Sequence, residues 1–132
     1  MTMPIITAFY AGLLAILLVA LGMWVVRTRV RERVALGDGG KPAMITAIRI
    51  HGNAAETIPL GLLLLLLLEL TGGSAVWLHV WGSLLVAGRV AHVWGLSRER
   101  KVNPARKTGM VLTWLSTLGL AISLLLRAAP QL

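Results

Sequence analysis

The feature that most constrains this 132-residue chain is a series of four long apolar stretches. We place them at about residues 5–26, 45–70, 75–96 and 109–126. Each is roughly 18–26 residues long, and about 20 helical residues cross the hydrocarbon core of a bilayer. Backbone polar groups in lipid must be satisfied within their own segment, so such spans form helices. The sequence therefore predicts an all-α integral membrane protein, a four-transmembrane-helix bundle that uses residues 1–132 as one domain.

The composition agrees with a membrane bundle and excludes several other classes. Hydrophobic residues make up 57% and charged residues 14%, against about 45–50% and about 25% in an average soluble domain. The same figures exclude disorder, because disordered chains are polar and rich in charge. The chain has no cysteine, which excludes disulfides, iron–sulfur clusters and cysteine nucleophiles. We expect no metal site, because the three histidines fall on different faces or depths.

Lysine and arginine predict the orientation of the bundle. The net charge is +8, and most basic residues lie in the connections after the first and third spans: Arg27, Arg29, Arg31, Arg33, Lys41, Arg98, Arg100, Lys101, Arg106 and Lys107. Such loops stay in the cytoplasm, so we expect both termini outside. Residues 71–74 carry no positive charge, and Glu69 just before them is expected to be interfacial and solvated. Topology thus accounts for most of the charge, and no nucleic-acid partner is expected.

Polar residues inside the spans are the most informative positions, because such residues usually face a bundle interior or a cavity. Arg49, Asn53 and Glu56 are spaced by four and three residues, so they share one helix face. Arg89 and His92 likewise share one side of the third span. At about 1.5 Å per residue, Glu56 and Arg89 both lie roughly 21 Å from the outer ends of their spans.

Three spans thus place polar groups in one layer of the cytoplasmic half of the membrane. Arg49 and Arg106 fall at roughly 31 Å, the cytoplasmic edge of a core about 30 Å thick. This positively charged layer suits a small anionic ligand from the cytoplasm. Glu56 and Arg89 taken alone are also explained by a structural ion pair between two helices. The whole layer is not, because such a pair does not require Arg49, His92 and Arg106 beside it.

Three segments resemble the motifs of MAPEG, the membrane-associated proteins in eicosanoid and glutathione metabolism. The second-helix motif of that family has Arg, Asn, Glu and Pro at the spacings found here at Arg49, Asn53, Glu56 and Pro59. Residues 89–95 look like its third-helix motif, in which arginine is followed three residues later by tyrosine or histidine. Residues 103–109 look like the start of its fourth helix, where an arginine serves catalysis.

The resemblance covers essentially the whole chain and is strongest to the small bacterial members, which implies the inner membrane. It implies a homotrimer with glutathione bound between neighbouring subunits. The residues it implies as glutathione ligands or their close neighbours are Arg29, Arg49, Asn53, Glu56, Arg89 and His92. Arg106 matches the arginine that activates the thiol, since an adjacent cation raises the fraction of reactive thiolate.

The leading interpretation is a glutathione-dependent transferase or peroxidase that acts on lipophilic electrophiles reaching it through the membrane lipid. Thr57 and Leu96 stand where some members carry tyrosine, which leaves a second interpretation open. In that case the chain binds a lipid or a partner without catalysis, and Arg106 is a loop arginine that sets topology. A small transporter is a third interpretation, although four-helix exporters usually need a buried carboxylate in the first helix and this chain has none there.

Overall fold

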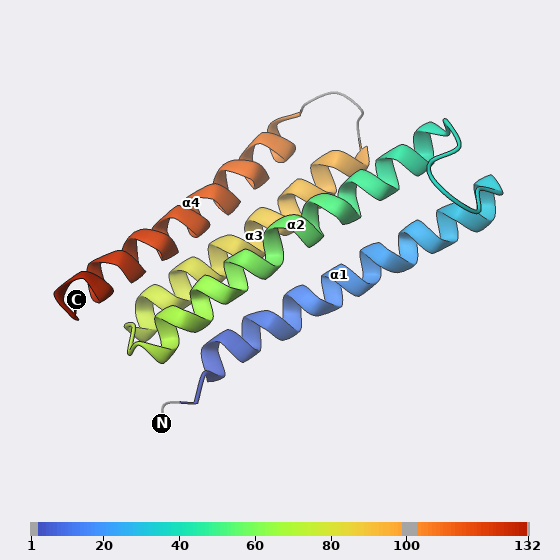
Figure 1. The fold of residues 1–132 in the computed structure, drawn as a ribbon. Coiled ribbons are helices and arrows are strands. Elements are labelled where there is room, and N and C mark those ends of the chain that lie inside the picture. Colours follow the sequence, from blue (N-terminus) through green and yellow to red (C-terminus); the bar gives the residue numbers. More distant parts are fainter. Residues whose placement is uncertain (1–2, 99–102, 132) are drawn as a thin grey trace.

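A computed structural model describes residues 3–98 and 103–131. Within these residues there are four long helices, followed by one short 3-10 helix (Figure 1). They are α1 (Ile5–Glu32), α2 (Pro42–Leu70), α3 (Ala75–Arg98), α4 (Pro104–Ala128) and η1 (Ala129–Gln131). All four long helices are long and apolar enough to cross a membrane, which confirms the predicted all-helical architecture with four spans.

Two helices extend well beyond the apolar stretches that predict them. Helix α1 continues to Glu32 and ends where Arg33 adopts a left-handed conformation, with φ of 56°. Helix α4 begins at Pro104. Proline suits the first helical turn, because backbone N–H groups there have no partner within the helix and proline has no N–H group. Apolar composition marks only the part of a helix that lies in lipid, whereas caps set its ends. Arg106 consequently lies in the first turn of α4 and not in a loop.

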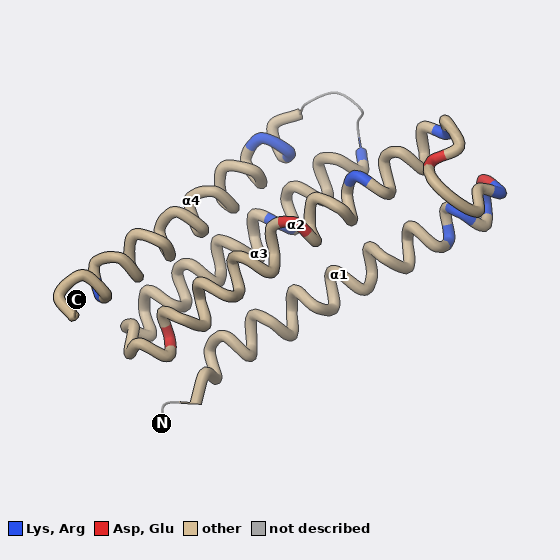
Figure 2. The backbone as a smooth tube through the Cα atoms, in the orientation of Figure 1, with Lys and Arg blue, Asp and Glu red and all other residues tan. Residues whose placement is uncertain are grey.

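The helices run alternately up and down, so the connections fall at two ends of the bundle. The start of α1, the end of α4 and the α2–α3 turn lie at one end (Figure 1). The α1–α2 connection, the end of α3 and the start of α4 lie at the other, where most lysines and arginines gather (Figure 2). We call these the terminal end and the basic end. Arg100 and Lys101, which the sequence assigns to the third loop, lie outside the described residues.

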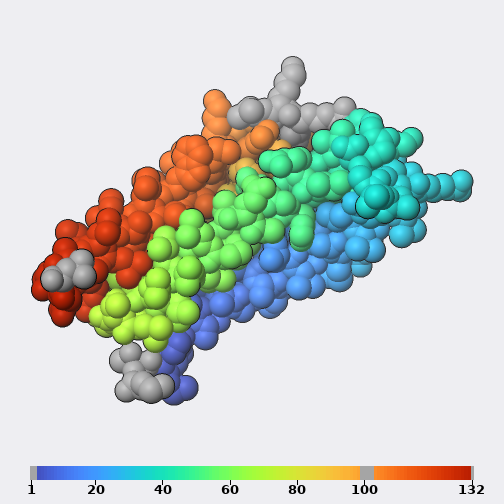
Figure 3. Space-filling model, viewed as in Figure 1, coloured from blue at the N-terminus to red at the C-terminus, as the bar shows by residue number. Residues whose placement is uncertain are grey.

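On the face shown in Figure 3, α2 lies between α1 and α4. The interior holds two apolar clusters. One consists of Leu14, Leu21, Ile50, Ala54, Ile58 and Leu85, and the other, nearer the terminal end, of Tyr10, Leu65, Leu68, Leu78 and Leu120. Many other large apolar side chains are exposed on the outside of the helices, as lipid requires.

Glycines allow α3 and α4 to pack closely. A Cβ atom placed on Gly88 would lie 2.7 Å from Oγ1 of Thr113, and one on Gly109 would meet the backbone of His92. Small residues let membrane helices approach in this way, where van der Waals packing is the main attraction between them. Close packing of these two helices carries the first turn of α4 toward the second half of α3.

Glu69 is buried, which corrects the expectation that it is solvated. Only 8% of the residue is exposed. Its carboxylate accepts hydrogen bonds from the backbone N–H groups of Ile6, at 2.9 Å, and Thr7, at 2.7 Å. These groups are unpaired at the start of a helix, and the helix dipole favours negative charge there. The end of α2 thereby caps the start of α1, a contact between segments far apart in sequence.

Candidate functional site

A cavity of about 560 Å³ lies between α2, α3 and α4 toward the basic end. Four residues predicted to form the site line it: Arg49, Asn53, His92 and Arg106. The other lining residues are Pro42, Ile45, Thr46, Leu96 and Met110. Aspartate and glutamate are absent from this lining as described. The volume falls within the range of about 300–1,000 Å³ of small-molecule sites, and two guanidinium groups make this cavity suitable for an anion.

The local structure at the start of α4 explains why Arg106 reaches this cavity. Asn103 caps the helix, because its side-chain oxygen accepts a hydrogen bond from the backbone N–H of Arg106 at 2.9 Å. The amide nitrogen of the same side chain donates to the carbonyl oxygen of Gly95 in α3 at 2.7 Å. One asparagine therefore both starts α4 and attaches it to α3, near His92.

Arg89 lies behind the cavity and does not line it. It is 2% exposed, and it donates from Nε to Oγ1 of Thr113 at 3.0 Å. Its Nη1 donates to Oδ1 of Asn53 at 2.7 Å and to Oγ1 of Thr57 at 2.9 Å. One guanidinium thus joins α2, α3 and α4 through neutral oxygens. Because these oxygens carry no charge, the positive charge of Arg89 adds to that of the site.

The ion pair considered from the sequence between Glu56 and Arg89 does not form in the chain. Among the described residues, the one carboxylate within 4.0 Å of a basic group belongs to Glu32, which contacts Arg31 at 3.1 Å. Asn53 and Thr57 are four residues apart and share the face of α2 that meets Arg89. Glu56 precedes Thr57 by one residue, which rotates it by about 100° away from that face. It is exposed on the surface of the chain.

Glu56 instead lines a second cavity of about 350 Å³, between α2 and α4. The other residues of this cavity are Thr57, Leu60, Thr113, Trp114, Thr117 and Leu118. Asn53 in the first cavity and Glu56 in the second are three residues apart, or about 4.5 Å along the helix axis. The two cavities therefore follow one another along the groove between α2 and α4.

Arg29 also lies away from the first cavity. Its Nη1 donates to the carbonyl oxygen of Gly37 at 2.8 Å, within the α1–α2 connection. A ligand-binding role for Arg29 stays a prediction. Sequence reasoning missed Thr46, which lines the first cavity three residues before Arg49. Its spacing of three residues from Arg49 could have indicated that Thr46 shares the face of α2 that carries Arg49. No spacing rule indicates that Thr57 pairs with Arg89, because that contact joins two helices.

Known proteins match most of this sequence. A family model described as the MAPEG family matches residues 7–126. Two similar proteins, both named inner membrane protein YecN, come from Escherichia coli strain K12 and Escherichia coli O6:H1. Each is 42% identical over 113 residues, which cover 86% of this chain and 85% of the relative. The family match includes every polar residue that lines the two cavities.

Proposed function

Since this chain belongs to the MAPEG family, we propose that it is a glutathione-dependent transferase or peroxidase that acts on lipophilic electrophiles. It is an integral membrane protein, and its YecN relatives point to the inner membrane. One observation carries the proposal. Arg49, His92 and Arg106 come from three different helices and line one cavity together with Asn53, and its described lining contains no carboxylate.

The residues of the site match the charged groups of glutathione. This tripeptide has two carboxylates, a thiol and an ammonium group. Arg49 and Arg106 offer guanidinium donors to anionic groups. Asn53 has its oxygen engaged by Arg89, so its amide N–H groups are the ones left for a ligand. Glu56, about 4.5 Å further along the groove, offers an acceptor for the ammonium.

Bound glutathione supplies the thiol, and a free thiol has a pKa of about 8.5, so it is mostly protonated at neutral pH. The guanidinium group of Arg106 stabilises the anionic sulfur of the bound thiolate. It does so from the first turn of α4, where the helix dipole adds positive potential. Trp114 and Leu118 in the adjacent cavity provide an apolar surface for the electrophile. Lipophilic substrates thus approach along the groove from the membrane.

We also propose that the subunits form a homotrimer, with the basic end in the cytoplasm and both termini outside. Arg49 and Glu56 support the assembly, because both are exposed on α2 in the single chain. A carboxylate facing lipid in the middle of a span is costly, so membrane carboxylates face protein or water. A neighbouring subunit that packs against the part of α2 carrying Arg49 and Glu56 shields both side chains from lipid. The basic residues of the α1–α2 connection support the orientation.

The test is a glutathione titration of the detergent-purified protein, in which the ultraviolet absorbance of the thiolate is the readout. We expect a saturable signal in the wild type and its loss in Arg106→Ala. Lys107→Ala is the matched control, because Lys107 is the next residue and is exposed, but does not line the cavity. It should retain the signal. Absence of glutathione binding to the wild type would refute the proposal.

A second candidate is a protein of the same family that binds a lipid or partner without catalysis. Two positions favour it. Leu96 lines the cavity without a polar atom, and the hydroxyl group of Thr57 is already engaged by Arg89. Neither position offers a free hydroxyl to a thiol. Under this candidate the titration shows ligand binding with no thiolate absorbance and no turnover of an electrophile.

A further inference from the structure

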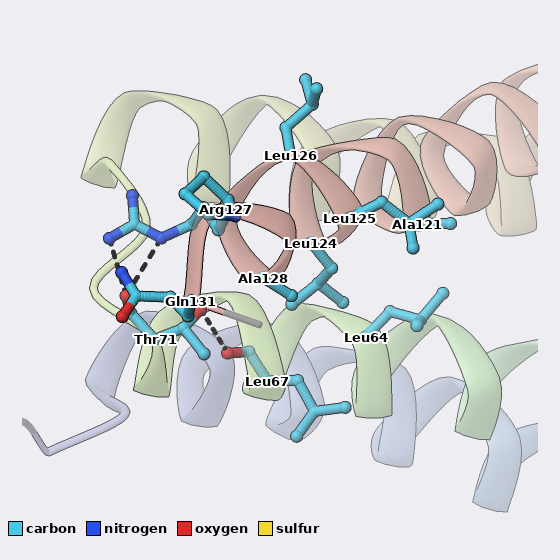
Figure 4. Close-up of a pocket in the computed structure, with 11 residues that line it drawn as sticks. Leu64, Leu67, Thr71, Ala121, Leu124, Leu125, Leu126, Arg127, Ala128 and Gln131 are labelled. Carbon is cyan, nitrogen blue, oxygen red and sulfur yellow. Dashed lines mark hydrogen bonds between the residues drawn. The ribbon is translucent and has the colours of Figure 1, made fainter.

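The largest cavity of the groove lies at the terminal end of the bundle and has no part in the proposed reaction. Its volume is about 1090 Å³ (Figure 4). Five of the eleven lining residues are leucines, among them Leu64 and Leu67 of α2 and Leu124 and Leu125 of α4. Arg127 is the one charged residue of the described lining. The cavity therefore combines a long apolar surface with a single positive charge at its end.

Arg127 is held in place by the α2–α3 turn. Its Nε and Nη2 both donate to the carbonyl oxygen of Thr71, at 3.0 and 2.7 Å (Figure 4). No carboxylate of the described residues lies within 4.0 Å of this guanidinium. Nη1 takes part in neither bond and has no hydrogen-bond partner among the described residues. The arginine is thus oriented by a neutral oxygen, and its charge can attract an anion.

We propose that this cavity binds an anionic phospholipid from the leaflet at the terminal end. Its phosphate pairs with Arg127, and one acyl chain lies along the leucine walls. A phospholipid has the same order of groups as the cavity, with negative charge at the membrane surface and hydrocarbon below it. Arg127 follows the last apolar turns of α4, so it lies where headgroups lie. Guanidinium groups pair well with phosphate oxygens, and basic residues near the interface attract anionic lipids.

The lipid site is separate from the proposed glutathione site and does not depend on it. Arg106 and Arg127 lie near opposite ends of α4, roughly 31 Å apart at about 1.5 Å per residue. A phosphate at Arg127 therefore cannot contact a thiol at Arg106. Substitutions in the terminal cavity should leave the glutathione titration unchanged, so failure of one proposal does not bear on the other.

The test measures lipid binding to the delipidated full-length protein in detergent micelles. Phosphatidylglycerol and phosphatidylcholine with identical acyl chains are titrated, and bound lipid is counted by native mass spectrometry. We expect saturable binding with at least a tenfold preference for phosphatidylglycerol. Arg127→Gln should remove this preference, and Arg127→Lys should restore part of it. Lys107→Gln, at the basic end, is the matched control and should bind as the wild type does.

A groove-filling variant, Ala121→Phe, tests the acyl chain, because Ala121 lines the cavity. It should weaken the binding of both lipids. Equal lipid binding by the wild type, Arg127→Gln and Ala121→Phe would overturn the proposal. The proposal would also be overturned if Ala121→Phe changed the number of subunits but left lipid binding unchanged. In that case the groove would be a contact between copies of the chain. Inorganic phosphate is also added to the protein with phosphatidylglycerol bound. If phosphate displaces the lipid as effectively as free phosphatidylglycerol does, the cavity is only an ion site and the proposal fails. If Ala121→Phe fails to fold, the comparison of Arg127→Gln with Arg127→Lys decides.

Discussion

Replacing Arg89 by methionine separates its structural role from its role in the site. The substitution keeps an unbranched side chain of similar length but removes a charge and three hydrogen bonds between helices. Such bonds are worth about 0.6 kcal/mol each in a membrane protein, so together they contribute about 2 kcal/mol. Against this loss, the buried charge of an arginine in a span costs about 2.5–3.5 kcal/mol. The two terms largely offset each other, and we expect the free energy of unfolding to change by less than about 2 kcal/mol.

Binding should weaken in Arg89→Met even though stability changes little. Thr57 and Thr113 keep other partners, because their hydroxyl groups also donate to backbone carbonyls. Asn53 loses the contact that orients its side chain toward α3. We therefore expect glutathione affinity to fall about tenfold, which corresponds to about 1.4 kcal/mol.

Two assays test these expectations. Stability is measured by denaturant unfolding in micelles with circular dichroism as the readout, and binding is measured by the glutathione titration. Thr57→Val is the matched control, because it removes one of the three bonds with little change in shape. It should cost about 0.6 kcal/mol or less. A loss of more than about 3 kcal/mol in Arg89→Met would refute the reasoning, because that is the cost of breaking a buried ion pair. Unchanged glutathione affinity would show that Arg89 does not position Asn53.

Three further predictions concern the contacts that hold the helices together. Glu69→Gln weakens two charge-assisted bonds to the start of α1, so it should lower stability by about 1–2 kcal/mol and leave the glutathione titration unchanged. Gly109→Ala forces α4 away from α3 and should cost about 1–3 kcal/mol. Gly12→Ala, with nothing within 4 Å of the added Cβ, should be neutral or stabilising in the same unfolding assay. Asn103→Ala removes the cap of α4 and its bond to α3, so it should cost about 0.5–2 kcal/mol and reduce the thiolate signal by displacing Arg106.

Much of this protein could be predicted from its sequence because the membrane leaves few alternatives. Lipid cannot bond to the backbone, so each apolar stretch had to be a helix of a set minimum length. Helical periodicity then placed Arg49 and Asn53 on one face of α2, and both line the same cavity. Equal depth along neighbouring spans brought His92 and Arg106 to that cavity as well.

The partners of the charged groups were decided only by the tertiary structure. Equal depth suggested that Glu56 would meet Arg89, but the rotation of α2 presents Thr57 to Arg89 instead. Sequence periodicity says which residues share a face of one helix, and it does not say which helix that face meets. That choice follows from how closely the helices approach, which glycines such as Gly109 permit in the packed bundle. Glu69 shows the same limit, because its contact with the start of α1 joins residues more than 60 positions apart.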